Sequence, residues 1–499
     1  MSLKKIILII FVISGQVCSN PLFHQKIAQG IPYLYNLELK KASDIFNEAA
    51  KISPDDPRSY YYIAQIHLWS FLGSKEEHEY KQFFKFSDIA KNKIESIEKI
   101  DGKDYLADFW KGNIYTQRAL AYSSKDKMLD AFWAAKKAIG YLEDVIDEKP
   151  DFYDAYLGIG IFDYALTYVP GIFKFALTLT GLDADKLQGF NNVRLAKQKG
   201  SLFKTEATFH LARMYTDYLA EYDSSAILLN SLIKKFPRNS LFIYQYAITL
   251  IYQRKLDLAE KELYKVINLN NKNFSQTNSF SYFLLGDVQL RKNNFNEAIE
   301  NYIKFLTTTK AVDYTGIAGL RVALCYKFLN NEKLYEKYLL LARNGNKDIP
   351  EDSYAKEYSE ILFEYDLNKN QLTVIQAGNY LLAGEYKDVA KILNPVLHRI
   401  KQPDWKGKVL IYLAESNIEL GNYNSAFNFA SRAISVNYNF DKWILPYALY
   451  LKAKAYWLTG NDKEAVKYLL KAENENDYYK KEYLQSLINN LKQKLNLPE

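Results

Sequence analysis

The histidines are the side chains best suited to chemistry in this chain of 499 residues. Five are present: His24, His67, His78, His210 and His398. No two have metal-ligand spacing on one predicted helix, and the sequence contains no His-Glu-x-x-His, Cys-x-x-Cys, Gly-x-Ser-x-Gly or phosphate-binding glycine motif. We therefore interpret them as helix-surface or packing residues, and we predict no catalytic residue, no metal ligand and no cofactor.

Acidic pairs are the other candidates for catalysis. Glu76/Glu77 and Asp147/Glu148 fall at predicted helix ends and loops, where solvation explains them. A glycoside-cleaving enzyme needs two carboxylates held across a cleft, which one sequence does not reveal. It would also need a compact catalytic domain, and no region leaves the helical period for long enough to form one. We predict that the protein is not an enzyme and keep a hydrolase as the least favoured alternative.

The elements that position these residues are marked by pairs of small residues twelve positions apart. The pairs are Gly30/Ala42, Ala247/Ala259, Gly286/Ala298, Gly378/Ala390, Ala414/Ala426 and Ala453/Ala465. Small residues on two helices let the backbones approach closely, while an aromatic or leucine one turn away fills the groove beside them. Gly421 and Gly460 stand where the first helix of a hairpin must end, since glycine tolerates the left-handed cap conformation. The pattern predicts a stack of helical hairpins, and six in-phase occurrences disfavour an ordinary helical bundle.

The units resemble tetratricopeptide repeats, a family with a 34-residue period. In the first unit the residues at the family's spacing are Gly30, Tyr33, Ala42, Phe46, Ala49 and Pro54. Six units fit well, at roughly 23–56, 240–273, 279–312, 371–404, 407–440 and 446–479. The resemblance implies an all-α, right-handed α-solenoid of stacked tetratricopeptide hairpins.

An apolar segment at 156–190 interrupts the repeats. Asp163, Lys174 and Pro170-Gly171 divide it into two short pieces, which favours two helices joined at a kink over a membrane span. We expect Gly160 at a close-approach position and 172–180 to lie across the solenoid as an inserted flap.

The order of residues in this block resembles the inclusion-body clearance family of eukaryotic tetratricopeptide proteins. The likeness covers Gly158 to about Tyr215, with a glycine-phenylalanine pair, a proline and an apolar helix between repeats. It implies a shared architecture and a non-enzymatic protein. Two features depart from the family: Pro170 stands alone where the family has two prolines, and the family is intracellular whereas this chain begins with an export leader.

Residues 1–19 have the pattern of a signal peptide: two lysines, an apolar stretch and a small-residue exit at Val17-Cys18-Ser19. We expect the mature chain to begin near Asn20 and to be periplasmic, and association with the outer membrane stays open. Acylation of Cys18 is the alternative, although Val17 and Gly15 are poor lipobox residues.

Composition indicates a folded protein. Hydrophobic residues make up 48% and charged residues 25%, and the formal net charge of +7 is spread over predicted helix surfaces. We therefore predict no nucleic-acid partner. Removal of the leader leaves Cys325 as the only cysteine, so no intramolecular disulfide can form, and we expect Cys325 to be a buried core thiol.

We divide the chain into 1–19, an N-terminal solenoid at 20–238 with the apolar insertion, and a C-terminal solenoid at 239–499. The first helix of each tetratricopeptide unit lines the concave surface in the family. Carried onto this sequence, the groove positions are Tyr244, Tyr252, Phe280, Phe283, Asp287, Arg291, Tyr447, Tyr450, Lys454 and Trp457.

This aromatic groove predicts a non-catalytic scaffold that binds a protein or extended peptide in the cell envelope. A peripheral membrane contact through 172–180 is a further expectation. The alternatives are a surface glycan-binding lipoprotein and, less favoured, an envelope hydrolase.

Overall fold

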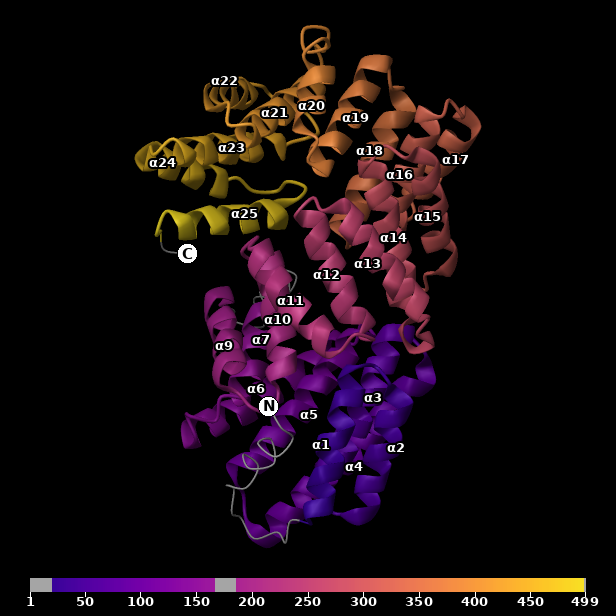
Figure 1. The fold of residues 1–499 in the computed structure, drawn as a ribbon, viewed down its shortest axis with the longest axis vertical. Helices are drawn as coiled ribbons and strands as arrows, with labels where there is room; N and C mark the ends of the chain where they lie inside the picture. Colours follow the sequence, from indigo (N-terminus) through magenta and orange to yellow (C-terminus); the bar gives the residue numbers. More distant parts are fainter. Residues whose placement is uncertain (1–19, 167–184, 498–499) are drawn as a thin grey trace. The chain divides into compact units, whose positions relative to one another are not determined.

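The computed structural model describes residues 20–166 and 185–497, and every regular element in these ranges is a helix (Figure 1). The predicted all-α class is confirmed. The expected leader at 1–19 and the expected flap at 172–180 lie outside the described residues. Among the described residues, no helix combines the length and the apolar character that crossing a membrane would require.

Two compact units divide the chain. The first comprises the residues up to Leu72 together with Glu76–Asp151, and the second comprises Gly73–Lys75 and Phe152–Glu499. The boundary that we expected at 238/239 falls inside the second unit, between two helices that pack on each other.

The first unit consists of long helices that pair along the sequence. They are α1 (Pro21–Tyr35), α2 (Leu39–Ile52), α3 (Pro57–Ser74), α4 (Glu77–Asp101), α5 (Tyr105–Ser123) and α6 (Met128–Glu148). Asn20 caps α1 by accepting a hydrogen bond from the Leu22 amide, and Pro21 occupies the first helical position, where its missing N–H has no cost. The acidic pairs lie at helix ends as predicted, since α4 begins at Glu77 and α6 ends at Glu148.

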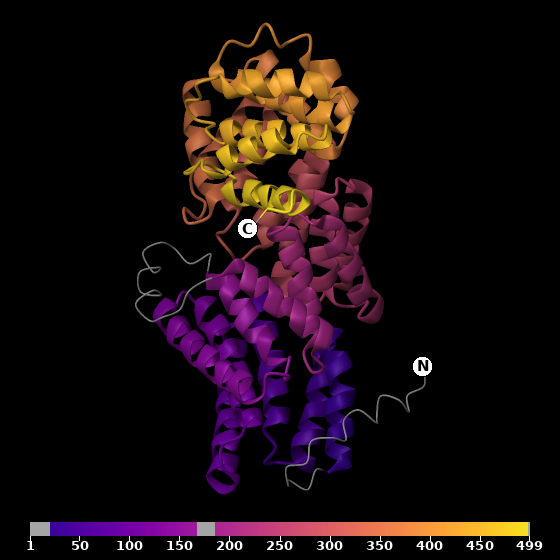
Figure 2. The same ribbon diagram turned by 90° about the vertical axis from the view of Figure 1, so that its left-hand side faces the viewer.

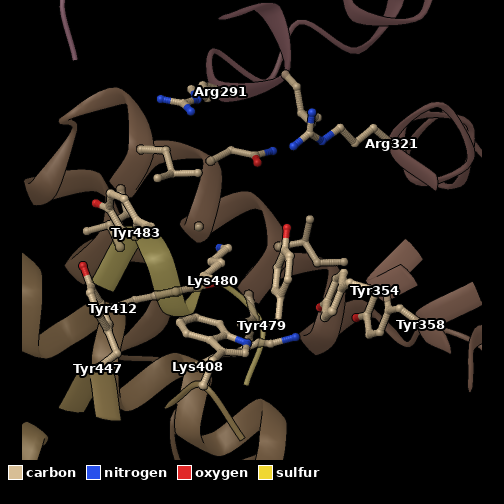
Figure 3. A pocket seen from close by; sticks show the side chains of 18 of the residues that line it. Arg291, Arg321, Tyr354, Tyr358, Lys408, Tyr412, Tyr447, Tyr479, Lys480 and Tyr483 are labelled. Atoms are coloured by element: carbon tan, nitrogen blue, oxygen red, sulfur yellow. The ribbon is translucent and has the colours of Figure 1, made fainter. Parts of the chain in front are cut away.

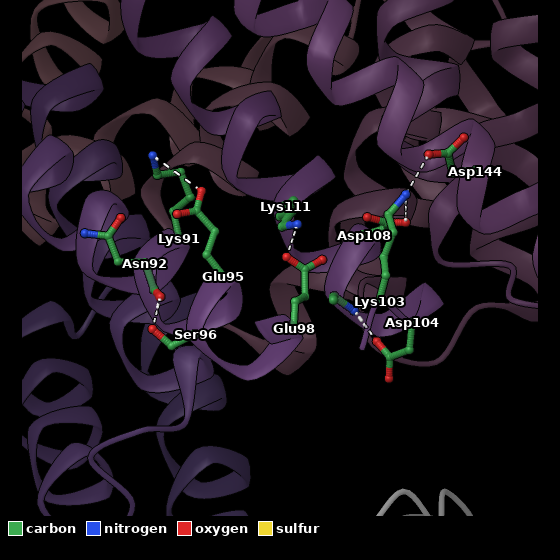
Figure 4. A network of polar contacts seen from close by, with 11 residues as sticks. Lys91, Asn92, Glu95, Ser96, Glu98, Lys103, Asp104, Asp108, Lys111 and Asp144 are labelled. Carbon is green, nitrogen blue, oxygen red and sulfur yellow. Dashed lines mark hydrogen bonds and ion pairs between the residues drawn. The ribbon is translucent and has the colours of Figure 1, made fainter. Parts of the chain in front are cut away.

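A polar network connects α4, α5 and α6 (Figure 4). Lys111 pairs with Glu98, and Lys103 reaches both Asp108, at 3.0 Å, and Asp144, at 3.3 Å. Burial raises the pKa of Asp108, an effect that Lys103 opposes. Glu98, Asp108 and Asp144 each have a cationic partner on another segment, which is the arrangement of structural ion pairs.

The second unit continues the hairpins to the end of the chain. Its helices are α7 (Ala155–Leu166), α9 (Lys186–Lys199), α10 (Lys204–Asp217), α11 (Tyr222–Lys235), α12 (Ser240–Tyr252), α13 (Leu256–Leu269), the short 3-10 helix η2 (Lys272–Phe274), α14 (Ser275–Arg291), α15 (Phe295–Thr308), α16 (Thr315–Phe328), α17 (Glu332–Ala342), α18 (Pro350–Glu364), α19 (Lys369–Ala383), α20 (Tyr386–Leu393), α21 (Pro403–Glu419), α22 (Tyr423–Ile434), α23 (Ile444–Leu458), α24 (Asp462–Glu473) and α25 (Lys481–Lys494). Each helix packs mainly on its neighbours in sequence, as in a solenoid.

Two of the hairpin turns begin at the glycines that the sequence predicts to end a helix. Gly421 has φ 77° just after α21, and Gly460 has φ 75° just after α23, so both adopt the left-handed conformation that ends a helix. At Gly286 on α14, a Cβ would lie 2.6 Å from the ring of Tyr302 on α15. Glycine at this position therefore permits the close helix contact that the small-residue pairs predicted.

Two alanines test this packing energetically. Ala426 on α22 and Ala465 on α24 are 1% and 0% exposed. We expect replacement of either by leucine to lower the free energy of unfolding by about 1–3 kcal/mol, because the added atoms have no space. Urea unfolding of both variants measures the effect, with the exposed Lys463→Leu on α24 as the matched control. If Ala426→Leu and Ala465→Leu both had the same free energy of unfolding as the parent, the assigned positions within the repeat would be wrong.

The last helix returns toward the start of the second unit. The Asn489 side-chain amide on α25 donates a hydrogen bond to the Tyr218 carbonyl oxygen at 3.1 Å, next to α10. The rings of Tyr483 on α25 and Tyr252 on α12 stack with centroids 6.1 Å apart. In both views α25 lies beside the magenta helices of the same unit (Figure 1, Figure 2). The repeats thereby enclose an inner space that belongs to this unit alone.

Candidate functional site

A cavity of about 270 Å³ lies in the inner space of the second unit (Figure 3). Side chains from α14, α16, α18, α19, α21 and α23 line it, together with the connection that leads into α25. Its aromatic lining residues are Tyr354, Tyr358, Trp405, Tyr412, Trp443, Tyr447, Tyr478, Tyr479 and Tyr483. Its charged lining residues are Arg254, Asp287, Arg291, Arg321, Lys408, Glu415 and Lys480. The site is therefore aromatic and cationic.

Two of the five lining cations are paired with the two lining carboxylates. Arg321 on α16 pairs with Asp287 on α14. Arg254, in the turn between α12 and α13, pairs with Glu415 on α21, a residue 161 positions away in the sequence. This second pair joins distant repeats and fixes the width of the pocket.

A third pair lies at the edge of the pocket. Lys408 on α21 contacts Asp441 with Nζ and Oδ2 2.7 Å apart, and the Asp441 side chain is only 2% exposed. Asp441 also accepts hydrogen bonds from Trp443 Nε1 at 2.9 Å and from the Tyr354 hydroxyl at 3.4 Å. One buried carboxylate thus holds three of the lining residues in place.

Arg291 and Lys480 differ from the other lining cations. Within the part of the chain that the structure describes, neither forms an ion pair with a carboxylate. Arg291 Nη1 donates a hydrogen bond only to a backbone oxygen, that of Ile251, at 3.3 Å. Lys480 lies over the Trp443 ring at 4.8 Å and over the Tyr479 ring at 5.4 Å. Figure 3 shows Arg291 and Arg321 on one side of the pocket and Lys480 among the tyrosines.

The environment of Lys480 disfavours its charge. Its place in the wall of the pocket lowers its pKa to about 8, first by desolvation and then through the nearby charges of Lys408, Arg321 and Arg291, while Asp441 opposes them and part of the side chain stays open to solvent. Burial also lowers the pKa of Arg291. The pocket therefore holds two positive charges that form no ion pair with the described residues.

We expect Lys480→Met to raise the free energy of unfolding at pH 7, because it removes a disfavoured charge. The gain should be at most about 1 kcal/mol, because solvent screens a side chain that is open to the cavity. The advantage should be complete below pH 8 and disappear between about pH 8 and the pKa of an unfolded lysine, about 10.4, because only the charged form is disfavoured. Urea unfolding at pH 7 and pH 9.5 measures this, with the exposed neighbour Lys481→Met as the control. A lower stability of Lys480→Met at pH 7 would contradict the expectation.

Stacked tyrosines form one wall. The rings of Tyr354 on α18 and Tyr479, just before α25, lie 4.1 Å apart between centroids at an interplanar angle of 11°. Tyr354 also stacks on Tyr358 at 5.5 Å. Burial raises the pKa of Tyr479, so its hydroxyl stays protonated at neutral pH. The connection between α24 and α25 is thus a structural part of the site.

Three of the ten residues predicted for the groove line this pocket: Asp287, Arg291 and Tyr447. Phe283 and Tyr450 are buried in the hydrophobic cores, at 6% and 7% exposure.

The other five lie beside the pocket or on other faces of the repeats. Tyr244 and Phe280 pack against hydrophobic cores, and Tyr252 stacks on Tyr222 with centroids 5.1 Å apart. Lys454 pairs with Glu419 at 2.7 Å, and Trp457 packs on the C-terminal core beneath Lys494. As a partner-binding set, the ten residues stay a prediction.

The sequence analysis missed Arg321, Lys408, Tyr479 and Lys480. Arg321 lies in a unit too degenerate for the repeat positions to be assigned. Lys480 follows the last recognised repeat, so no repeat position points to it. The run Tyr478-Tyr479-Lys480 across the end of that repeat was the available signal.

Cys325, the cysteine among the described residues, and two of the histidines, His67 and His210, have structural surroundings. Cys325 is fully buried, and burial raises its pKa to about 12, which confirms a core thiol. Burial lowers the pKa of His210 to about 3, and His67 contacts Glu79 at 2.6 Å. Within residues 20–166 and 185–497, no three histidine, cysteine or acidic side chains are placed to hold a metal ion.

Fold and pocket define a helical-repeat protein of the kind suited to protein–protein interaction. Residues 154–315 match the family model described as Iml2/Tetratricopeptide repeat protein 39, and residues 446–476 match the model described as Tetratricopeptide repeat. The chain therefore contains tetratricopeptide repeats, as predicted. The resemblance of the central block to the inclusion-body clearance family is confirmed, because that block lies within the first match.

Solved tetratricopeptide structures resemble the chain at low identity. The crystal structure of yeast Tom70 is 13% identical, covers 89% of this chain and 96% of its own, and gives a TM-score of 0.32. The APC/C hetero-tetramer Cut9-Hcn1 is 13% identical over 92% of this chain and 94% of its own, with a TM-score of 0.26. A tetratricopeptide repeat protein from Parabacteroides merdae is 14% identical over 57% and 97%, with a TM-score of 0.24. These scores carry no argument about function, and no curated protein matches the chain.

Proposed function

We propose that the protein is a non-catalytic, exported scaffold that binds a protein or extended peptide partner in the cell envelope through the pocket of its second unit. The observation that carries this proposal is the combination of stacked aromatic walls and two cations without carboxylate partners inside a tetratricopeptide solenoid. Aromatic side chains offer a large contact area at a low cost in conformational entropy.

The pocket is built before a partner arrives. The pairs Arg254–Glu415 and Lys408–Asp441 hold its walls, and the Tyr354–Tyr479 stack holds the connection to α25. A preformed site loses little freedom when a ligand binds, so more of the contact energy is available as affinity.

The acidic groups support the non-catalytic part of the proposal. Asp287 is bound by Arg321 and by the Tyr302 hydroxyl at 2.5 Å. Glu415 is bound by Arg254 and by the Tyr447 hydroxyl at 2.8 Å. Carboxylates held in this way position walls and are poorly placed to exchange protons with a substrate.

Site-specific photo-cross-linking tests the proposal. Benzoylphenylalanine in place of Tyr479 lies in the pocket, and the same residue in place of Tyr365, which is 65% exposed and does not line it, is the control. We expect irradiation of whole cells to give a discrete protein adduct from position 479 and not from position 365. Equal labelling from both positions, or no adduct from 479, would contradict partner binding at this pocket.

Export to the periplasm is supported only by the pattern of residues 1–19, so it stays part of the proposal. We expect mass spectrometry of the protein from cells to find a mature N-terminus near Asn20. An acylated Cys18 would overturn this expectation and favour the alternative, a surface glycan-binding lipoprotein whose aromatic pocket stacks on sugars. Membrane contact through 172–180 also stays a prediction, on residues outside those described.

A further inference from the structure

The charges of the pocket are unevenly matched. Arg254, Arg321 and Lys408 each have a carboxylate partner, whereas Arg291 and Lys480 have none within the described part of the chain. Both unmatched cations line the pocket, Arg291 half-buried and Lys480 with its side chain open to the cavity, and desolvation disfavours the charge of each. A protein that retains such charge at a cost in stability often uses it for a ligand.

The carboxylates of the pocket are bound by other side chains, and Asp287 and Asp441 act on Arg291 and Lys480 only through space. Asp287 already accepts from Arg321 and Tyr302. Glu415 accepts from Arg254 and Tyr447. Asp441, an acidic group outside the lining, accepts from Lys408, Trp443 and Tyr354. Among the described residues no carboxylate is left to pair directly with Arg291 or Lys480, so both cations are open to a negative charge from a ligand.

The number of free cations limits the charge of that ligand. A polyanion such as a nucleic acid binds through many cationic contacts, and this pocket offers two. Around them the lining is aromatic and aliphatic, including Trp443 and Tyr479, on which Lys480 lies. The surroundings fit one anionic group attached to an apolar or aromatic body.

The size of the pocket points the same way. At about 270 Å³ it is near the lower end of the range for small-ligand sites, which is roughly 300–1,000 Å³. Such a space accepts one or two side chains of an extended segment and is too small for a folded domain. The partner must therefore insert a short stretch of chain.

We infer that the pocket binds an internal segment of the partner protein, in which the side-chain carboxylate of an Asp or Glu lies between Arg291 and Lys480 and an adjacent aromatic or aliphatic side chain packs on Tyr479 and Trp443. This inference rests on the proposed function and specifies the chemistry of the partner. The connection into α25 contributes Lys480 and Tyr479, so the site is complete only when α25 is folded against the repeats.

Selection from a random peptide library tests the inference on the full chain. The probe is a library of twelve-residue peptides fused at the amino terminus of a phage coat protein, so that no peptide carries a free C-terminal carboxylate. We expect the selected sequences to be enriched in Asp or Glu next to an aromatic or aliphatic residue. Selection of neutral or basic sequences, or no enrichment, would overturn the inference.

Binding of one selected peptide then locates the contact. Fluorescence anisotropy should show at least tenfold weaker binding when the acidic residue of the peptide is changed to its amide. Lys480→Gln and Arg291→Gln should each weaken the acidic peptide by about tenfold and leave the amide peptide unchanged. The control Lys481→Gln, whose Nζ bonds to Asn476 outside the pocket, should bind both peptides as the parent does.

Urea unfolding shows whether each variant is folded. Lys480→Gln removes a disfavoured charge, so a loss of binding by this variant does not arise from unfolding. Equal weakening of the acidic and amide peptides would overturn the inference, since the lost contact would then not be ionic. Binding of the free C-terminus of a peptide in place of its acidic side chain would overturn it as well.

The inference and the proposed function fail in different ways. A partner that is cross-linked from position 479 but captured equally by Lys480→Gln and Arg291→Gln supports the proposed function and overturns the inference. Acidic peptides that bind as described, with no cross-linked protein in cells, support the inferred chemistry and overturn the proposed function.

Discussion

Asp441→Ala should lower the free energy of unfolding of the second unit by about 3–5 kcal/mol. Among the described residues the substitution removes the one carboxylate paired with Lys408, whose side chain is only 9% exposed. Burial disfavours the charge of Lys408, and Asp441 together with Tyr358 and Tyr412 more than offsets this effect, so that the pKa of Lys408 is raised in the fold. Without Asp441, the buried ammonium loses its counter-charge.

A double variant distinguishes this mechanism from a loss of packing. In Asp441→Ala combined with Lys408→Met, no charge is left buried, so the double variant should be more stable than Asp441→Ala alone by at least about 1 kcal/mol. Urea unfolding followed by tryptophan fluorescence suits the measurement, because Trp405 and Trp443 line the same pocket. If Asp441→Ala alone were as stable as the parent, the Lys408–Asp441 pair would not have the role assigned to it.

Gly160→Leu should destabilise the packing of α7 on α9 by about 3 kcal/mol or more. A Cβ at Gly160 would lie 2.7 Å from the carbonyl oxygen of Gly189 and 2.9 Å from Val193 Cγ2. The nearest obstacle is backbone, which cannot rotate away as a flexible side chain does. The two helices would have to separate to accept the new side chain.

Gly140 on α6 supplies the matched control. No atom lies within 4 Å of a Cβ placed there, so Gly140→Leu should be neutral or slightly stabilising, because leucine favours a helix over glycine by about 0.5–1 kcal/mol. Hydrogen exchange of α7 and α9 reads out the effect of Gly160→Leu locally, which suits a chain with two units. Unchanged protection of these helices would show that the contact is not tight.

The repeat architecture was predictable because its signals are local. A small residue, an aromatic one turn away and a helix-ending glycine all lie within one 34-residue period, as Ala453, Gly460 and Ala465 show. Such contacts form between neighbours in sequence, so their spacing alone predicts which side chains pack together. Gly160 was placed correctly at a close approach for the same reason.

The individual groove residues were harder to predict. Counting positions along the first helix of a hairpin identifies a face, and it found Asp287, Arg291 and Tyr447 in the pocket. It does not distinguish a side chain displayed to the cavity from one buried against the next repeat, such as Phe283 or Tyr450. That difference depends on how strongly successive hairpins are rotated, which no single period encodes.

The sequence by itself determined the helical hairpins, their turns and the core thiol at Cys325, because each depends on residues close together along the chain. Only the tertiary structure decided where the charges meet. Arg254 reaches Glu415 and Tyr354 stacks on Tyr479 across more than a hundred residues, because the repeats curve until α25 returns to α10. That curvature is the sum of many small rotations between hairpins, and it leaves Arg291 and Lys480 inside the pocket without a carboxylate of the described chain to pair with.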